Sequence, residues 1–312
     1  MTYKNRLIFL ETLIGVLIVI YIASVIFTSD IGSKSSSYTW LEPKTAEKTI
    51  RIVIKNADNE IELKKKSSQW FVSHNGLEYP AKKLRVEDFL KILTSRSAWP
   101  VRSTSASTHE RFGLEQSTSR VTIYGETVFL DLIVGNEDDY KSEIYLRKAG
   151  QNEVRAGDNA IKSYISSPVT SWYNLRLISD TDNGSVDLNA VQRLSVYTPR
   201  ETQVFSRKNK RWEISGISIT NPDQNAVDAY IRQILTVEGD NFDNSINGAD
   251  PMFDKTSIVL ELGNGRIVTV RFSEPDESGR RFAHVSGKDY IYSIPTWQAE
   301  KLFKNASSFE TQ

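Results

Sequence analysis

Apolar side chains form one long run near the start of the chain, and after it they recur in short alternating groups. Residues 7–27 carry a single charge, that of Glu11, and the basic residues Lys4 and Arg6 precede them. An α-helix rises about 1.5 Å per residue, so this run can cross a hydrocarbon core, which needs roughly 20 residues. Because cytoplasmic flanks favour positive charge, we expect a cytoplasmic N-terminus and an extracytoplasmic C-terminal part.

A cleaved signal peptide is the main alternative to a membrane anchor. Its apolar region is normally about 7 to 15 residues long and ends at a site with two small residues. The run here is longer and ends in the bulky side chains of Val25, Ile26 and Phe27, which favours a retained anchor. Glu11 has two interpretations, a charge tolerated at the headgroup layer, which is favoured, and a contact with a partner helix in the membrane.

Beyond the anchor, hydrophobic periodicity predicts strands and helices. Residues 29–47 are rich in serine and lack this periodicity, which is typical of a flexible stalk, and the folded part is expected to begin near Lys48. Strands are predicted at residues 50–54, 60–64, 69–72, 120–123, 127–132, 144–147 and 153–155, and again at 194–197, 203–206, 211–214, 257–262, 266–270, 282–285 and 290–292. Helical spacing relates Val86, Phe89, Leu90 and Leu93, and again Val227, Tyr230, Ile231 and Ile234; short helices are predicted at 160–165 and 296–303.

The order of these elements occurs twice. Trp70 and Trp212 lie in equivalent strands about 140 residues apart, and a proline-containing loop, at residues 79–80 or 221–222, precedes each long helix. We therefore predict an α+β fold, with an N-terminal transmembrane helix followed by two tandem, similar modules. Each module is expected to be a mainly antiparallel β-sheet with packed helices. The predicted parts are a cytoplasmic tip and anchor at 1–28, a stalk at 29–47, a first module at 48–179, a turn-rich linker at 180–190 and a second module at 191–309.

Composition narrows the classes of function. The chain has 39 basic and 39 acidic residues, so no net charge attracts nucleic acid. It has no cysteine, which excludes disulfides, thiolate nucleophiles and thiolate metal sites. Neither a glycine-rich nucleotide-binding motif nor the nucleophile elbow of serine hydrolases occurs. The sequence therefore predicts no catalytic residue and no cofactor.

The residue types that bind metals do not form a recognised pattern. His74, His109 and His284 are isolated in sequence, which argues against a zinc site. Two acidic segments, residues 180–187 and 240–250, carry the oxygen ligands that Ca²⁺ prefers. Since turns also require Asp, Asn and Gly, the turn interpretation is favoured. No metal site is predicted, although the sequence leaves open whether an acidic loop binds calcium.

Aromatic side chains suggest a further alternative, a surface that stacks on sugars or binds peptides. The candidates are Trp70, Trp99, Trp172, Trp212 and Trp297. Large aromatics at repeated sites normally anchor a core, so a core role is favoured. Trp99, beside Pro100, is less easily assigned to a core. The same is true of Trp40, which lies in the predicted stalk and fits the membrane surface, where indoles are enriched.

Several of these features together resemble a known bacterial family. They are a tryptophan-containing strand, residues 79–80, an amphipathic helix, Phe112-Gly113-Leu114, a hairpin ending at Gly135, and a strand with Tyr145 and Arg147. The pattern is similar to the domain-of-unknown-function family 4340 (DUF4340) over about residues 50 to 180. The second half is similar only in outline, because residues 252–254 replace Phe-Gly-Leu. The resemblance implies one N-terminal membrane anchor and, since some members are encoded beside gliding-motility-type ABC transporters, an accessory envelope role. The family has no catalytic residues to carry over.

Two classes of function fit this sequence. The favoured one is a non-catalytic accessory or interaction component of an envelope complex such as an ABC transporter. It would be a single-pass inner-membrane protein with a periplasmic C-terminal part. The alternative is an envelope hydrolase or a carbohydrate- or peptide-binding protein with its site between the two modules. The expected partners are the membrane, through residues 7–27, and ABC transporter subunits, and not nucleic acid.

Overall fold

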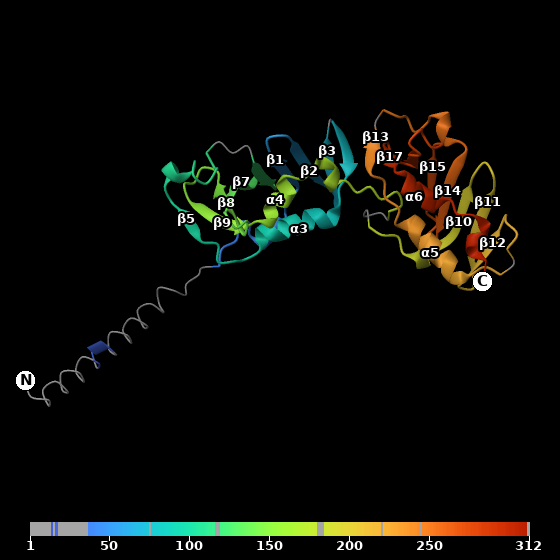
Figure 1. Cartoon of the computed structure of the whole chain (residues 1–312), viewed down its shortest axis with the longest axis horizontal. Helices are drawn as coiled ribbons and strands as arrows, with labels where there is room; N and C mark the ends of the chain where they lie inside the picture. The colour runs from blue at the N-terminus through green and yellow to red at the C-terminus, as the bar shows by residue number, and fades with distance from the viewer. Residues whose placement is uncertain are drawn as a thin grey trace, which may run out of the picture.

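The structure is a computed structural model, and it describes residues 14, 16–17, 37–74, 76–115, 119–179, 184–219, 221–243 and 245–310. These residues form two antiparallel β-sheets, each with a long helix and a short helix beside it (Figure 1). Apart from three residues, the predicted anchor at residues 7–27 lies outside the described part of the chain. Within the described ranges, no helix is both long enough and apolar enough to cross a bilayer.

The first sheet has nine strands in the order β4-β3-β2-β1-β6-β7-β8-β9-β5. They are β1 (Arg51–Lys55), β2 (Glu60–Lys66), β3 (Gln69–His74), β4 (Leu77–Pro80), β5 (Val101–Ser103), β6 (Arg120–Tyr124), β7 (Val128–Glu137), β8 (Glu143–Lys148) and β9 (Val154–Asp158). Successive side chains of a strand point to opposite faces. Ile52 and Ile54 are therefore buried in the core, whereas Arg51 and Lys55 lie on the open face.

The second sheet has eight strands in the order β12-β11-β10-β14-β15-β16-β17-β13. They are β10 (Val191–Tyr197), β11 (Thr202–Lys208), β12 (Arg211–Ser215), β13 (Asn241–Asp243), β14 (Thr256–Leu262), β15 (Ile267–Phe272), β16 (Arg281–Val285) and β17 (Ile291–Ile294). Side chains again alternate between the two faces of the sheet, and Ile258 and Leu260 of β14 are buried on the inner face.

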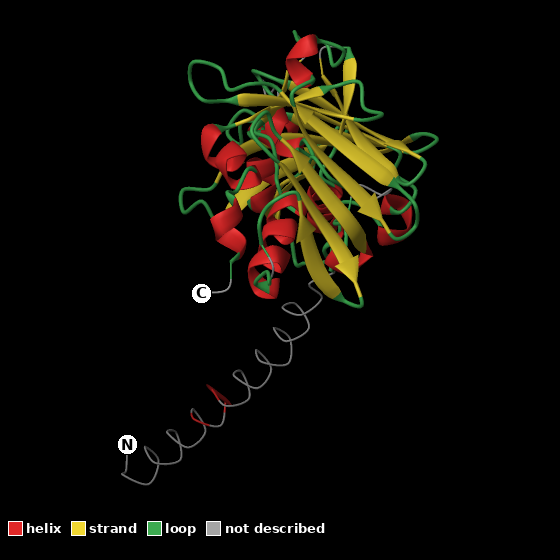
Figure 2. Cartoon of the chain, turned by 90° about the vertical axis from the view of Figure 1, so that its right-hand side faces the viewer, coloured by secondary structure: helices red, strands yellow, loops and turns green. Residues whose placement is uncertain are grey.

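The long helices are α3 (Lys83–Thr94) and α5 (Gln224–Leu235), and the short ones are α2 (Pro43–Ala46), α4 (Ala160–Ile165) and α6 (Thr296–Leu302). Single 3₁₀ turns are η1 (Ala106–Thr108), η2 (Val169–Trp172), η3 (Leu188–Ala190), η4 (Pro251–Phe253) and η5 (Ala306–Phe309). The predicted helical spacings are confirmed, because Val86, Phe89 and Leu93 of α3 are buried and Leu90 is partly buried, and the four residues predicted for α5 are all buried. The Asp223 side chain begins α5 by accepting hydrogen bonds from the N–H groups of residues 225 and 226. Figure 2 shows the helices mainly to one side of the strands.

Corresponding strands have the same order in the two sheets. The series β3-β2-β1-β6-β7-β8-β9-β5 matches β12-β11-β10-β14-β15-β16-β17-β13, and β4 is additional. The short helices α4 and α6 follow the equivalent strands β9 and β17. We call the parts built on the two sheets the first and second units.

Three short elements differ from the sequence-based expectations. Residues 79–80, predicted to be a loop, end strand β4, which pairs with β3 through Val72 and Tyr79. Strands β5 and β13 were not predicted, and each has only three residues at the edge of its sheet. Periodicity cannot identify such short strands, because about four residues are needed to establish an alternation.

Part of the predicted stalk packs on the first unit. Trp40 and Leu41 are only 4% and 3% exposed, and the Leu41 N–H donates to the carbonyl oxygen of Leu93 at 3.0 Å. The rings of Tyr38 and Trp40 contact each other edge to face at 5.1 Å. The predictions that Trp40 lies at the membrane surface and that residues 38–47 form a flexible stalk are therefore wrong. Burial of these aromatic side chains outweighs the polar composition of the segment.

The remaining tryptophans mostly follow the core prediction. Trp70, Trp172 and Trp212 are buried, and Trp99 is partly buried against the core. The Trp212 Nε1–H donates to Asp228 on α5 at 2.7 Å, which satisfies the polar edge of that ring. Trp297 is the exception, since it is 57% exposed and the amino group of Lys301 lies 4.4 Å from its ring centroid. The core prediction is wrong for Trp297.

A cluster of aromatic rings joins the two units. Tyr79 of β4 stacks flat on Phe242 of β13, with ring centroids 4.6 Å apart and an interplanar angle of 9°. Tyr173, Tyr290 and Tyr292 surround Phe242 at 5.1, 4.8 and 5.0 Å. We call these five residues the aromatic joint. Burial raises the pKa of Tyr173 and of Tyr290 to about 12, as expected for phenols removed from water.

Backbone pairing reinforces the aromatic joint. The Gly239 N–H donates to the Leu175 carbonyl at 2.8 Å, and the Leu177 N–H donates to the Val237 carbonyl at 3.2 Å. On the other side, the Asn174 N–H donates to the carbonyl of Pro80 in the first unit at 2.7 Å. Residues 174–177 therefore hydrogen-bond to both units, before the predicted linker at 180–190 begins.

Lys288 makes the stability of the aromatic joint dependent on pH. Its amino group donates to the Tyr292 hydroxyl at 2.8 Å, and burial, with a smaller contribution from Arg266, lowers its pKa from 10.5 to about 8. Between these pH values the unfolded chain holds a proton that the folded protein has released. The free energy of unfolding should therefore rise with pH across this window.

The measurement is urea unfolding of the wild type and of Lys288→Met from pH 7 to pH 10, in detergent. Taking the difference between them removes contributions from other titrating groups. We expect the wild type to gain stability relative to the variant as the pH rises above 8. Parallel profiles would contradict the lowered pKa.

Candidate functional site

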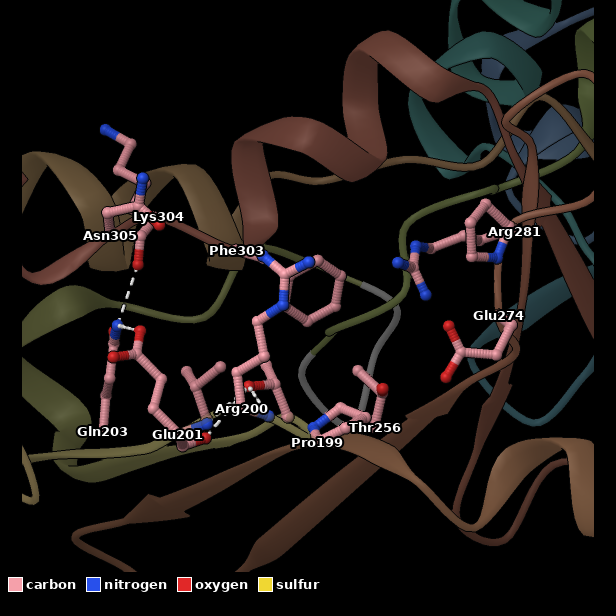
Figure 3. A pocket seen from close by; sticks show the side chains of 13 residues that line it. Pro199, Arg200, Glu201, Gln203, Thr256, Glu274, Arg281, Phe303, Lys304 and Asn305 are labelled. Carbon is pink, nitrogen blue, oxygen red and sulfur yellow. Dashed lines mark hydrogen bonds between the residues drawn. The ribbon is translucent and has the colours of Figure 1, made fainter.

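A cavity of about 610 Å³ lies at one end of the second sheet (Figure 3). The hairpin between β10 and β11 and the hairpin between β15 and β16 contribute to its walls, and the segment after α6 closes it. Its lining residues are Val196, Thr198, Pro199, Arg200, Glu201, Gln203, Thr256, Glu274, Pro275, Arg281, Phe303, Lys304 and Asn305. A cavity of this size lies within the range of small-molecule sites.

Gln203 is a buried polar residue in the lining and is only 2% exposed. Its Nε2 group donates to Glu201 Oε1 at 2.5 Å and to the Lys304 carbonyl at 2.8 Å. Its Oε1 atom is buried and has no hydrogen-bond donor among the described residues. Leaving such an acceptor unpaired costs about 1–3 kcal/mol. The buried Gln203 oxygen therefore lowers the free energy of unfolding.

Arg281 and Arg200 supply positive charge. The Arg281 Nη1 group donates to the Ser273 carbonyl at 2.6 Å, and its guanidinium lies 5.2 Å from the Phe303 ring centroid. Burial lowers the pKa of Arg281, and the nearby carboxylate of Glu274 opposes that shift; an arginine nevertheless stays charged. In Figure 3, Arg281 enters the cavity from one side and Arg200 rises from the hairpin on the other.

The hairpin that carries Arg200 is held by its own side chains. The Thr198 hydroxyl oxygen accepts hydrogen bonds from the N–H groups of Arg200 and Glu201, at 3.3 and 3.1 Å. The Thr198 hydroxyl donates to the Glu201 carbonyl at 3.0 Å. This local pattern is typical of turns initiated by threonine and fixes the backbone from which Arg200 extends.

Two carboxylates, Glu201 and Glu274, share the lining with these cations. None of the ion pairs in the described part of the chain includes Arg200, Arg281, Glu201 or Glu274. Charges of both signs therefore face one cavity without neutralising each other within 4 Å. Such a lining can bind a ligand that carries an anionic and a cationic group.

A second cavity of about 610 Å³ lies where the two units meet. It is lined by Lys82, Lys83, Leu84, Arg85, Glu87, Asn174, Arg176, Gly184, Ser185 and Glu238. The guanidinium of Arg85 lies 4.7 Å from the ring centroid of Tyr164 and 4.8 Å from that of Trp172, and it donates to the Ser167 hydroxyl at 2.7 Å. Arg176 donates to Ser185 at 2.7 Å and pairs with Glu238 at 3.7 Å.

The histidines and acidic segments singled out in the sequence do not form a metal site in the described residues. His109 bonds to the Asn152 carbonyl at 3.0 Å, and the two ring nitrogens of His284 contact Arg271 and the Lys288 carbonyl at 2.9 and 3.1 Å. His109 and His284 thus form hydrogen bonds with nearby protein groups.

In the second acidic segment the side chains of Asp243, Asn247 and Asp250 accept hydrogen bonds from N–H groups two residues ahead. This is the predicted turn pattern. Most of the first segment lies outside the described residues, and its last residue, Asp187, begins η3 by accepting from the Asn189 N–H.

The cavity of the second unit was not predicted from the sequence. Its residues come from five separate stretches of chain, and no motif links them. One feature of the sequence could have indicated it. Gln203 lies two residues before the buried Phe205 in β11, so the alternation of the strand places this polar residue on the inward face. A polar residue at an inward position of a strand is the kind of exception that marks a functional site.

The family model for the domain of unknown function DUF4340 matches residues 70–238, which is more than half of the chain. The chain belongs to this family. The match runs from β3 of the first unit through α5 of the second, so the DUF4340 region includes parts of both units and extends beyond residue 180, where the resemblance in sequence was expected to end. No curated protein and no solved structure matches the chain.

Proposed function

We propose that this DUF4340 protein is a non-catalytic, membrane-anchored component of an envelope complex, with an ABC transporter as the favoured partner. Residues 7–27 would cross the inner membrane once, with the N-terminus in the cytoplasm and both units in the periplasm. The two units would be copies of one module. The shared order of strands and the position of the short helices support this duplication.

The observation that carries the proposal is the aromatic joint. Two sheets joined by stacked rings and by backbone hydrogen bonds move as one body more readily than as independent domains. Such a body offers a long surface of fixed shape, which suits an interaction protein.

Affinity purification in mild detergent from the native host tests the proposed role. We would compare three tagged forms: the full chain, a form in which an unrelated single-pass helix replaces residues 1–28, and a form in which a cleavable export signal replaces them. Recovery of transporter subunits with the first two forms would assign the contact to the folded units. Recovery with the full chain alone would assign it to the membrane helix. If no form recovers a stable partner, the proposal is wrong.

The cavity at the meeting of the units favours the second candidate, a carbohydrate- or peptide-binding protein or a hydrolase with its site between the modules. Lys82, Lys83, Arg85 and Arg176 outnumber the two carboxylates in its lining, and the Nε atoms of both arginines are buried with no hydrogen-bond partner among the described residues. Anionic glycans fit this charge best. The test is binding of envelope glycans to the full chain. This candidate is supported if Arg176→Gln abolishes binding and Arg211→Gln, which changes an exposed arginine, leaves it unchanged.

A further inference from the structure

Two residues that line the cavity of the second unit, Gln203 and Arg281, are polar at positions where the first unit has isoleucine. The registers of the sheets establish the first equivalence. In the first unit Ile54 of β1 lies opposite Ile61 of β2, and at the same place in the second unit Val196 of β10 lies opposite Gln203 of β11. Ile61 is 1% exposed and Gln203 is 2% exposed, so both side chains are turned into the core.

The second equivalence lies at the start of β8 and β16. Leu146 pairs with Val134, and Ala283 pairs with Phe272, at the same place in the two sheets. The inward position two residues earlier is Ile144 in the first unit, which is 1% exposed, and Arg281 in the second. Arg281 thus occupies, partly buried, the strand position that Ile144 fills in the first unit.

The first unit demonstrates that this fold closes its core with two isoleucines. The second unit instead buries a glutamine whose Oε1 atom has no hydrogen-bond donor among the described residues, and it partly buries Arg281, for which those residues provide no carboxylate within 4 Å. Both substitutions lower stability, because polar groups lose hydration that they do not fully recover. Features that cost stability and are not needed by the fold are typical of binding sites.

We propose that this cavity binds an α-amino acid or short peptide with a free ammonium and a free carboxylate. Arg281 and Arg200 are placed to bind the carboxylate, since guanidinium groups match its two oxygens. Glu274 and Glu201 provide negative charge for the ammonium, and Gln203 positions the Glu201 carboxylate through the hydrogen bond from its Nε2 group. The Phe303 ring forms an apolar wall for a side chain. This inference is independent of the partner proposed above.

Calorimetric titration of the full chain in detergent with the dipeptide alanyl-phenylalanine tests the proposal. Its N-acetylated form and its C-terminal amide remove one charge each. We expect the free dipeptide to bind and each blocked form to bind about tenfold to hundredfold more weakly, the loss typical of one charged hydrogen-bonding partner. Absence of heat with millimolar free dipeptide, or equal binding of the blocked forms, would overturn the proposal.

Three variants locate the site. Gln203→Ile and Arg281→Ile restore the residues of the first unit, and each should weaken binding about tenfold to hundredfold. Arg211→Gln, which changes an exposed arginine of β12, should leave binding unchanged.

The melting temperature separates loss of the site from loss of the fold. Gln203→Ile is expected to melt close to the wild-type temperature, because the gain from removing an unpaired buried acceptor is offset by loss of the two hydrogen bonds that Nε2 donates. Full binding by a stably folded Gln203→Ile protein would show that the dipeptide binds elsewhere. Because these titrations involve no transporter, their failure is distinguishable from failure of the proposed envelope role.

Discussion

Replacing Phe242 with alanine is expected to lower the free energy of unfolding by about 3–5 kcal/mol, the cost typical of truncating a buried aromatic side chain. Phe242 lies at the centre of the aromatic joint, with the rings of Tyr79, Tyr173, Tyr290 and Tyr292 all within 5.1 Å of its own. Each such ring pair adds about 0.5–1.5 kcal/mol beyond the area it buries. The loss should therefore be concentrated at the contact between the units.

The Phe242→Ala protein should also unfold in two steps. With the aromatic contacts reduced, the connection between the sheets relies largely on the hydrogen bonds of residues 174–177, and the units become thermodynamically separate. Urea unfolding followed by tryptophan fluorescence and by circular dichroism would reveal this, because the two probes would no longer give one transition. Phe71→Ala is the matched control, since Phe71 is only partly buried on the open face of β3. A single transition with an unchanged midpoint in Phe242→Ala would contradict the role of the joint.

Trp172→Ala is expected to have an effect of similar size, about 3–5 kcal/mol, within the first unit. Trp172 is fully buried, with the rings of Phe89 and Tyr164 at 5.9 and 5.8 Å and the guanidinium of Arg85 at 4.8 Å. Its removal would leave a large cavity beneath α3. It would also release Arg85, which lines the cavity between the units.

Two further tryptophan variants make this prediction specific. Trp297→Ala should change stability by less than about 0.5 kcal/mol, because Trp297 is an exposed residue. Trp172→Phe should cost less than Trp172→Ala, since it keeps an aromatic ring and removes an indole N–H that has no partner among the described residues. Equal losses for Trp172→Ala and Trp297→Ala in urea unfolding would refute the assignment of Trp172 as a core anchor.

Sequence patterns predicted the helices and long strands well because those elements are locally encoded. Val86, Phe89 and Leu93 are spaced for one face of a helix and lie on the buried face of α3. The alternation at residues 60–64 likewise appears as β2. The errors fall where tertiary contacts outweigh local composition. Trp40 is buried against the first unit although its neighbours in the sequence are mostly polar. Trp297 is exposed although its helix, α6, occupies the same place in the second unit as α4 in the first.

The cavity of the second unit could not have been predicted in the same way. The lining of the second-unit cavity combines β-hairpins, strand ends and the segment after α6, so its composition depends on which strands pair and in which register. A one-residue shift of register would exchange the inward and outward side chains of β11 and remove Gln203 from the cavity. The aromatic joint has the same character, since Tyr79 and Phe242 lie far apart in the chain and in different sheets.

The sequence by itself determined the type of each long element, the α+β class, the repeated order of elements and the family. Those properties follow from periodicities and motifs that span a few residues. Side chains that are close in sequence determine the local backbone conformation, so these patterns can be read without the tertiary structure. Only the tertiary structure decided where the units meet, which aromatic rings become core and which polar residues face a common cavity. Those properties depend on pairings between distant strands, and the free energy of such pairings comes from burial that no local segment achieves alone.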